Sequence, residues 1–124
     1  MTAPEERSGL LVDDMLGEPG AFGIVTVRHE GGGVAVSPAG DLDVSTSHKL
    51  LACVDDLLAE GRSPITIDLQ AVTFIDSSGL GALVKAHKRA APRAELVVAR
   101  ARPHIYRAME ISGILKVIRM SDAG

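Results

Sequence analysis

The first strongly patterned stretch of the chain follows the period of a β-strand. Residues 24–28 are rich in β-branched side chains, and after the glycines of residues 31–33 the alternation resumes at Val34 and Val36. Two such runs joined by a glycine-rich loop predict a β-hairpin. Pro38 has no backbone N–H, so the second strand should end there or carry Pro38 at an unpaired position.

The pattern then changes to the period of a helix. Apolar side chains recur about one helical turn apart, which places them on a single face. These side chains are Leu50, Leu51, Val54, Leu57 and Leu58. Asp43 or Ser45 can cap the start of this helix, because their oxygens accept hydrogen bonds from the unpaired N–H groups there. Gly61 is expected to stop it.

The rest of the chain alternates strands with helices. Strands are predicted over residues 65–69, over residues 95–98 and over residues 115–120, the last of which ends the fold. A second helix is predicted from about Ser78. A third helix is predicted over residues 103–113, because proline opens it and glycine closes it. The resulting order is β-β-α-β-α-β-α-β.

This order predicts an α/β fold in a single domain. Strands joined through helices form parallel crossovers, so four or five strands should make a mixed, mostly parallel sheet covered by helices. The break at Pro19 and Gly20 separates an N-terminal extension, residues 1–20, from the domain over residues 21–124. Residues 10–16 of this extension can form one short amphipathic turn, although a mobile tail is the simpler interpretation.

Composition and charge argue against nucleic acid as a partner. Of the 124 residues 46% are hydrophobic, which is enough for an aliphatic core, and the aromatic side chains are Phe22, Phe74 and Tyr106. Such a chain offers little surface on which bases could stack. Sixteen acidic residues against thirteen basic ones give a net charge of −3 without a basic stripe. Duplex binding needs a positive footprint, so we expect no nucleic-acid partner.

The compartment and the absence of a cofactor are also expected from composition. Cys53 is the single cysteine, so no intramolecular disulfide can form, which fits a reducing compartment. No apolar run approaches the roughly 20 residues that span a bilayer, and the acidic N-terminus is no signal peptide. The four histidines are scattered without metal-ligand spacing. We therefore expect a cytoplasmic protein with no membrane contact, no metal and no other cofactor.

One segment in the middle of the chain carries the chemistry, because a helix begins there just after a strand. A helix start has unpaired N–H groups and a partial positive charge, so Asp76, Ser77 and Ser78 are first of all candidates for its cap. Two hydroxyls after a carboxylate exceed what one cap needs. Gly79 and Gly81 cost about 1 kcal/mol each in a helix relative to Ala. Their smallness would permit close approach by another protein.

An enzyme is the weaker interpretation of this segment. Its Ser-Ser-Gly-Leu-Gly run is not the Gly-x-Ser-x-Gly of a hydrolase elbow, and no histidine is tied to it by sequence. The glycines followed by Lys85 lack the Gly-Lys-Ser/Thr of a phosphate-binding loop. A small hydrolase using Ser77 or Ser78 would have no evident general base, so we expect no catalytic residue.

Three segments resemble the STAS domain of bacterial anti-sigma factor antagonists. Residues 74–81 resemble the signature of that domain, with the letters Phe-Ile-Asp-Ser-Ser-Gly-Leu-Gly. Residues 40–43, Gly-Asp-Leu-Asp, resemble its turn after the second strand, and residues 108–114 resemble its last helix end. The segments fall in the family's order and cover about residues 21–120. Pro38 departs from the family pattern, which usually has an apolar strand residue there.

The resemblance implies a phosphorylation switch. In the family the serine directly after the aspartate is phosphorylated, which corresponds to Ser77, and Asp43 corresponds to an acidic residue near that site. The kinase is the anti-sigma factor itself, which uses ATP. The unphosphorylated antagonist binds it and so releases a sigma factor, and a phosphatase restores the binding form. The partner-binding surface implied around Ser77 consists of Asp43, Asp76, Ser78, Gly79 and Leu80.

Two other roles stay open for a STAS protein. A scaffold subunit of a signalling assembly that is not controlled by phosphorylation would share these features, and a large stable oligomer would favour it. The regulatory module of a membrane transporter also has this fold, but no spanning segment is present in this sequence. We further expect Asp43 and Ser77 to lie near each other, because partner sites in open α/β sheets lie beyond the carboxyl ends of strands.

Overall fold

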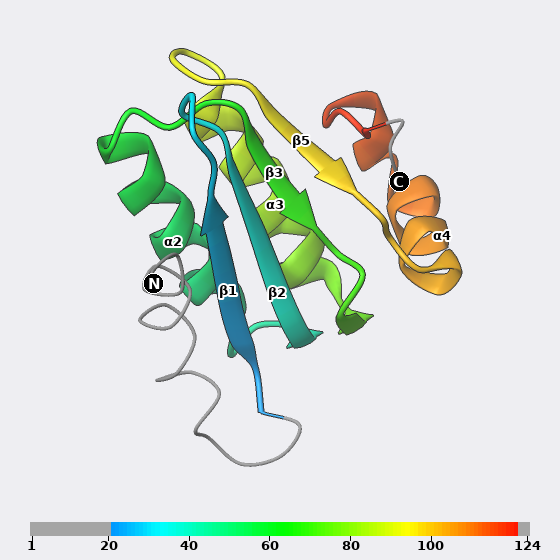
Figure 1. Cartoon of the computed structure of the whole chain (residues 1–124). Helices are drawn as coiled ribbons and strands as arrows, with labels where there is room; N and C mark the ends of the chain where they lie inside the picture. Colours follow the sequence, from blue (N-terminus) through cyan, green and yellow to red (C-terminus); the bar gives the residue numbers. More distant parts are fainter. Residues whose placement is uncertain (1–20, 122–124) are drawn as a thin grey trace.

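A computed structural model describes residues 21–121, which are built around one mixed five-stranded sheet (Figure 1). The strand order is β1-β2-β3-β5, and β4 pairs with the end of β2 outside this row. β1 is antiparallel to β2, and the other pairs are parallel, as predicted. The strands are β1 (Gly23–Arg28), β2 (Val34–Leu42), β3 (Ile65–Asp68), β4 (Val72–Ile75) and β5 (Leu96–Ala99). The extension predicted over residues 1–20, with its turn at residues 10–16, lies outside the described residues.

The helices lie behind one face of the sheet and beyond one of its edges (Figure 1). They are α2 (Ser47–Ala59), α3 (Ser77–Ala90), α4 (Pro103–Ser112) and a short 3-10 helix, η1 (Ile114–Lys116). α2 and α3 lie behind the sheet in Figure 1, and α4 and η1 lie beyond β5. The apolar positions of α2 that predicted a helix, Leu50, Val54 and Leu57, are fully buried. They pack in one core with alternate strand residues such as Val36 and Ile67.

The second strand does not end at Pro38, because β2 continues to Leu42. Pro38 is buried in the strand opposite Ile24 of β1. β2 pairs with β3 up to Val36 and with β4 from Gly40 onward, so Pro38 falls where β2 changes its parallel partner. A missing N–H costs least where no neighbouring strand needs it. The alternative prediction, Pro38 at an unpaired position, therefore holds on the side of β2 that faces β3 and β4, whereas β1 pairs with the other side.

The prediction of a strand over residues 115–120 is wrong. After α4 the chain turns through η1, and the Ile118 N–H donates to the Ile114 carbonyl at 2.9 Å. Ile114 and Ile118 are buried and lie about one helical turn apart, which explains their apolar character without a strand. Within the described chain this segment reaches the sheet by one isolated parallel bridge, between Met120 and Val98 of β5.

β4 is a strand that the hydrophobic pattern does not predict. Val72 and Ile75 are buried, whereas the two residues between them are exposed, so the alternation typical of a strand is missing. The strand forms because it continues the sheet beside the last residues of β2. It leads directly into α3 and therefore decides where that helix begins.

Candidate functional site

Two of the turns singled out by the sequence leave the sheet at the same edge. β2 and β4 are parallel with Leu42 opposite Ile75, and the Asp76 N–H donates to the Leu42 carbonyl at 3.3 Å. The residues that follow these strands, Asp43 on one side and Asp76 and Ser77 on the other, are therefore neighbours at the carboxyl edge. This is the placement that the sequence predicts for Asp43 and Ser77.

Asp76 is the N-cap of α3. Its backbone is extended, with φ −115° and ψ −171°, and its Oδ1 accepts a hydrogen bond from the Gly79 N–H at 3.0 Å. Its carbonyl accepts the first helical bond from the Leu80 N–H at 2.9 Å. A side-chain cap of this kind stabilises a helix by about 1 kcal/mol. The sequence left three residues open for this role, and the structure gives it to Asp76.

Ser77 and Ser78 are the first two residues of α3. Ser77 is exposed and Ser78 is half-buried, and neither hydroxyl makes a hydrogen bond within residues 21–121. Both lie at the positive end of the helix dipole, where the unpaired N–H groups favour an anion. The Ser77 hydroxyl is therefore accessible to another protein. A phosphoryl group on it would meet a favourable field.

Packing within the chain accounts for Gly79. The residue is buried, and a Cβ there would overlap the Leu42 carbonyl oxygen and approach Ile75 Cγ1 to 2.7 Å. The close approach that this glycine permits is thus made by β2. Gly81 differs, because a Cβ there would meet no atom within 4 Å, and the half-buried Leu80 between them packs against the core. The first turns of α3 are therefore tight on the β2 side and open at Gly81.

Asp43 organises the turn between β2 and α2. Its Oδ1 accepts hydrogen bonds from the Ser45 hydroxyl at 2.7 Å, from the Ser45 N–H at 3.0 Å and from Thr46 Oγ1 at 3.2 Å. These bonds, the one from the Ser45 hydroxyl above all, hold the pKa of the Asp43 carboxyl below its ordinary value of 3.8. Asp43 is thus negatively charged at neutral pH. The prediction that Asp43 or Ser45 caps α2 is wrong, because the cap position is Thr46 and the Asp43 carboxylate is used by the preceding turn.

Two exposed apolar side chains flank these turns. Val44 follows Asp43 directly and is 74% exposed, and Phe74 lies two residues before Asp76 and is 50% exposed. Large apolar side chains beside polar groups are typical of surfaces that contact another protein. The sequence reasoning missed both residues. The available signal for Val44 was an apolar side chain in a turn, where polar residues are usual. Phe74 lies within β4, and its exposure depends on the fold.

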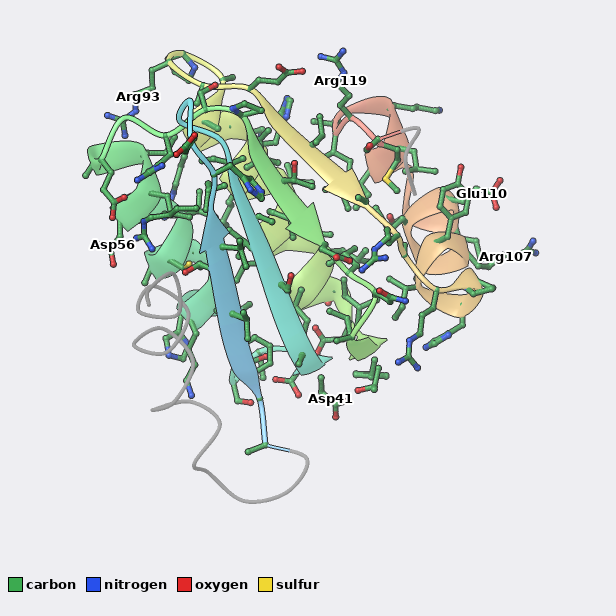
Figure 2. The ribbon with its side chains drawn as sticks, in the orientation of Figure 1. Asp41, Asp56, Arg93, Arg107, Glu110 and Arg119 are labelled. Carbon is green, nitrogen blue, oxygen red and sulfur yellow. The ribbon has the colours of Figure 1, made fainter. Side chains whose placement is uncertain are left out.

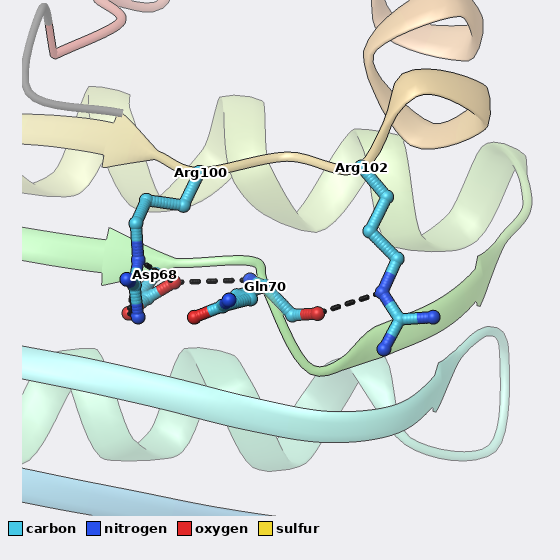
Figure 3. A network of polar contacts seen from close by, with 4 residues as sticks. All are labelled: Asp68, Gln70, Arg100 and Arg102. Carbon is cyan, nitrogen blue, oxygen red and sulfur yellow. Dashed lines mark hydrogen bonds and ion pairs between the residues drawn. The ribbon is translucent and has the colours of Figure 1, made fainter.

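The chain that leads into β4 is held by residues between β5 and α4. The Arg100 guanidinium contacts the Asp68 carboxylate, with Nη2 2.9 Å from Oδ2, and the Arg102 Nε donates to the Gln70 carbonyl at 2.8 Å (Figure 3). Asp68 Oδ1 also accepts from the Gln70 N–H at 3.0 Å. The backbone of Arg100 has φ 59°, a left-handed conformation that residues other than glycine rarely adopt. We call Asp68, Gln70, Arg100 and Arg102 the loop clamp.

β4 itself is tied on two sides by Thr73. The Thr73 hydroxyl donates to Asp41 Oδ1 at 2.9 Å, and its carbonyl lies 2.9 Å from His104 Nε2. Figure 2 shows Asp41 at this edge of the sheet, with Arg93 and Arg119 at the opposite end. These ties fix a strand of four residues that has one strand neighbour within residues 21–121. They thereby fix the start of α3.

Within residues 21–121 the arrangement offers an acceptor hydroxyl and a contact surface. No three His, Cys, Asp or Glu side chains of that part gather into a group that could hold a metal ion. Among its helices, none combines the length and the apolar character needed to cross a bilayer. No hydrogen bond described there joins Ser77 to a general base. An exposed hydroxyl such as that of Ser77 can accept a group that another molecule brings.

The profile of the STAS domain matches residues 24–123, which places the chain among STAS-domain proteins. The anti-sigma F factor antagonist of Paenibacillus polymyxa is 27% identical over 100 residues, which are 79% of this chain and 86% of that protein. The anti-sigma-B factor antagonist of Listeria monocytogenes is 31% identical over 85 residues, which are 68% of this chain and 75% of that protein. The chain belongs to the STAS-domain family of anti-sigma factor antagonists.

Solved structures share the fold. An anti-sigma factor antagonist from Mycobacterium paratuberculosis aligns with a TM-score of 0.74 at 24% identity, covering 86% of this chain and 91% of that chain. The phosphorylated form of the Bacillus cell fate determinant SpoIIAA aligns with a TM-score of 0.58 at 18% identity, covering 82% of this chain and 91% of that chain. The mixed sheet with its helices is therefore the STAS fold.

Proposed function

We propose that this chain is a cytoplasmic anti-sigma factor antagonist that is controlled by phosphorylation of Ser77. The unphosphorylated form binds an anti-sigma factor that is also a serine kinase, and this binding releases a sigma factor. The phosphorylated form does not bind until a phosphatase removes the phosphate. One observation carries the proposal: the Ser77 hydroxyl is exposed and unbonded in the described chain, at the start of a helix that Asp76 already caps.

The similar proteins support the class of partner. Two of them are named as antagonists of the anti-sigma F and anti-sigma-B factors, and SpoIIAA has been solved in a phosphorylated form. Ser77 directly follows the aspartate in the segment that resembles the STAS signature. We carry over the kind of partner and the kind of modification, and leave the particular factor open.

In the proposed step this chain supplies the acceptor and the partner supplies the catalysis. Ser77 Oγ attacks the γ-phosphorus of ATP, the bond from that phosphorus to the β–γ bridging oxygen breaks, and ADP leaves. The hydroxyl proton passes to a base of the kinase. Such transfer needs positioning and charge stabilisation, which an exposed serine receives from the enzyme that binds it. We therefore propose that the chain is not itself an enzyme.

The switch works through charge and desolvation at the site. A phosphate on Ser77 carries about −1.5 to −2 charges at neutral pH. Two like unit charges about 4 Å apart repel by roughly 4 kcal/mol at an effective dielectric near 20. A partner that covers Val44 and Phe74 would also strip water from the phosphate. The helix start stabilises the phosphate in the unbound protein, so the loss of affinity arises in the complex.

Calorimetry against the purified anti-sigma kinase, with and without ATP, tests this function. Wild type should bind without ATP, lose binding slowly with ATP and carry phosphate on Ser77 by mass spectrometry. Ser77→Ala should bind in both conditions, because no phosphate can be added. Ser77→Asp should bind more weakly than wild type, with a partial effect because it adds one charge.

Ser78→Ala is the matched control, because Ser78 is the next hydroxyl of the same turn. It should respond to ATP as wild type does. If ATP dissociates the wild-type and Ser77→Ala complexes equally, Ser77 is not the switch. A chain that binds no anti-sigma factor and forms a large stable oligomer would instead favour the scaffold role.

A further inference from the structure

A groove of about 510 Å³ lies between α2 and β1, a strand at one end of the strand order. Its β1 wall includes Phe22, Ile24 and Thr26, and its α2 wall includes Lys49, Ala52 and Cys53. The first three residues alternate along β1 and the other three lie within about one turn of α2, so each wall is one continuous face. We call this feature the edge groove.

The edge groove lies where a further element could pack beside α2 in the helical layer. Ile24 is only 9% exposed, and Phe22 and Cys53 are partly buried and packed against the core. α3 covers one flank of α2, and in Figure 1 no described helix lies on its other flank, next to β1. Layered α/β domains normally bury such a flank against a further element.

We propose that the chain's own N-terminal segment, residues 10–16, docks in the edge groove. The segment reads Leu-Leu-Val-Asp-Asp-Met-Leu, and its apolar side chains recur at the spacing of one helical face. The positions on that face are Leu11, Val12, Met15 and Leu16. Their burial against the groove would complete the helical layer beside α2.

The length of the connection restricts where this segment can lie. Residues 17–20 join it to Ala21, and Phe22 already lines the edge groove. Four residues extend over roughly 13 Å at most, so residues 10–16 begin within reach of the groove. The connection contains Gly17, Pro19 and Gly20, which are typical of a chain reversal. The segment can therefore fold back along the groove.

One exposed cation at the rim of the edge groove can pair with the acidic segment. The first 20 residues contain five acidic side chains and one arginine. The charged residues of the groove are Asp56, Arg28, which pairs with Glu60 at 2.8 Å, and Lys49, which makes no ion pair within the described chain. Lys49 is exposed at the rim. Asp13 or Asp14 would therefore meet an unpaired ammonium group on docking.

Cys53 is the chain's single cysteine and reports whether the groove is occupied. We expect iodoacetamide to alkylate it in the full chain roughly tenfold more slowly than in the Leu11→Asp/Leu16→Asp variant, which corresponds to about 1.4 kcal/mol of docking. Thr2→Asp/Ala3→Asp adds the same charge outside the segment and should react at the wild-type rate. Equal rates for wild type and the Leu11/Leu16 variant would overturn the proposal.

A cross-link distinguishes the chain's own segment from a second copy. In a glutathione redox buffer, Leu11→Cys or Met15→Cys should form an intramolecular disulfide with Cys53, seen by non-reducing mass spectrometry. Ala3→Cys is the control and should form none. Disulfides found only between two chains, or protection of Cys53 that grows with protein concentration, would show that another copy fills the groove and would contradict the proposal.

Discussion

At the start of α3, two adjacent side chains have separate tasks. The Asp76 carboxylate satisfies the Gly79 N–H, and the Ser77 hydroxyl makes no bond in the described chain. A side chain that gains and loses a phosphate can occupy the start of a helix only if another residue maintains the cap in both states. Asp76 provides that continuity, so the proposed phosphorylation of Ser77 would not remove a fold-stabilising contact.

This division predicts different stabilities for two alanine variants. Asp76→Ala should lower the free energy of unfolding by about 1 kcal/mol, because the Gly79 N–H loses its acceptor. Ser77→Ala should change it by no more than about 0.5 kcal/mol, as an exposed side chain without a bond usually does. Urea titration measures both values. If Ser77→Ala lost as much stability as Asp76→Ala, the serine would share the capping role.

The lowered pKa of Asp43 predicts that the free energy of unfolding depends on pH in the acid range. The hydrogen bonds from Ser45 lower its folded pKa below 3.8, so its contribution to stability is present above the unfolded pKa and is lost as the pH falls through the folded one. Asp43→Asn cannot titrate and should flatten the decline of unfolding free energy below about pH 4. Ser45→Ala should raise the pKa of Asp43 in an NMR titration. An unchanged pKa in that variant would contradict the assigned cause.

At the level of the helix, α3 offers a matched pair of glycines. Gly79→Ala should destabilise the protein by about 1–3 kcal/mol, because its Cβ overlaps the Leu42 carbonyl oxygen of β2. Gly81→Ala should stabilise it by up to about 1 kcal/mol, because there is open space and alanine favours a helix. Thermal denaturation should move the two melting temperatures in opposite directions. A gain in both variants would show that β2 does not press on Gly79.

The regularity of burial explains which elements the sequence could predict. Where an element buries one regular face, as α2 does with Leu50, Val54 and Leu57, apolar spacing predicts it. β4 buries only its two ends, so its pattern carries no period. Residues 115–120 carry apolar side chains, yet Ile114 and Ile118 are buried by a turn. Over so few residues, the spacing of apolar side chains does not distinguish a strand from a turn that buries two of them.

Across the whole domain, the placement of the site was more predictable than its contacts. Asp43 and Ser77 follow strand ends, and the rule for parallel sheets brings strand ends together. The packing role of Gly79 depends on the pairing of β2 with β4, which the sequence does not reveal. The exposure of Val44 and Phe74 likewise depends on what the fold leaves uncovered.

The attachment of β4 to the sheet sets an order of local opening. Among the described strands β4 pairs with β2 alone, whereas β2 and β3 have strand partners on both sides. Amide protons of β4 should therefore exchange with deuterated solvent through local opening, well before those of β3, which require global unfolding. Hydrogen-exchange mass spectrometry resolves the two peptides. Equal protection of β3 and β4 would contradict this order.

We expect the loop clamp to set how readily that opening occurs, because it holds the chain that leads into β4. Arg102→Ala removes the hydrogen bond to the Gln70 carbonyl and should speed exchange in β4 while leaving β3 unchanged. Arg107→Ala is the control, because Arg107 is exposed on α4 and is no member of the clamp. Asp76 alone separates Ser77 from the end of β4, so the proposed phosphorylation site lies beside a strand that we expect to open locally. A kinase that needs Ser77 in an extended chain would then capture a small opening of β4 and leave the rest of the domain folded.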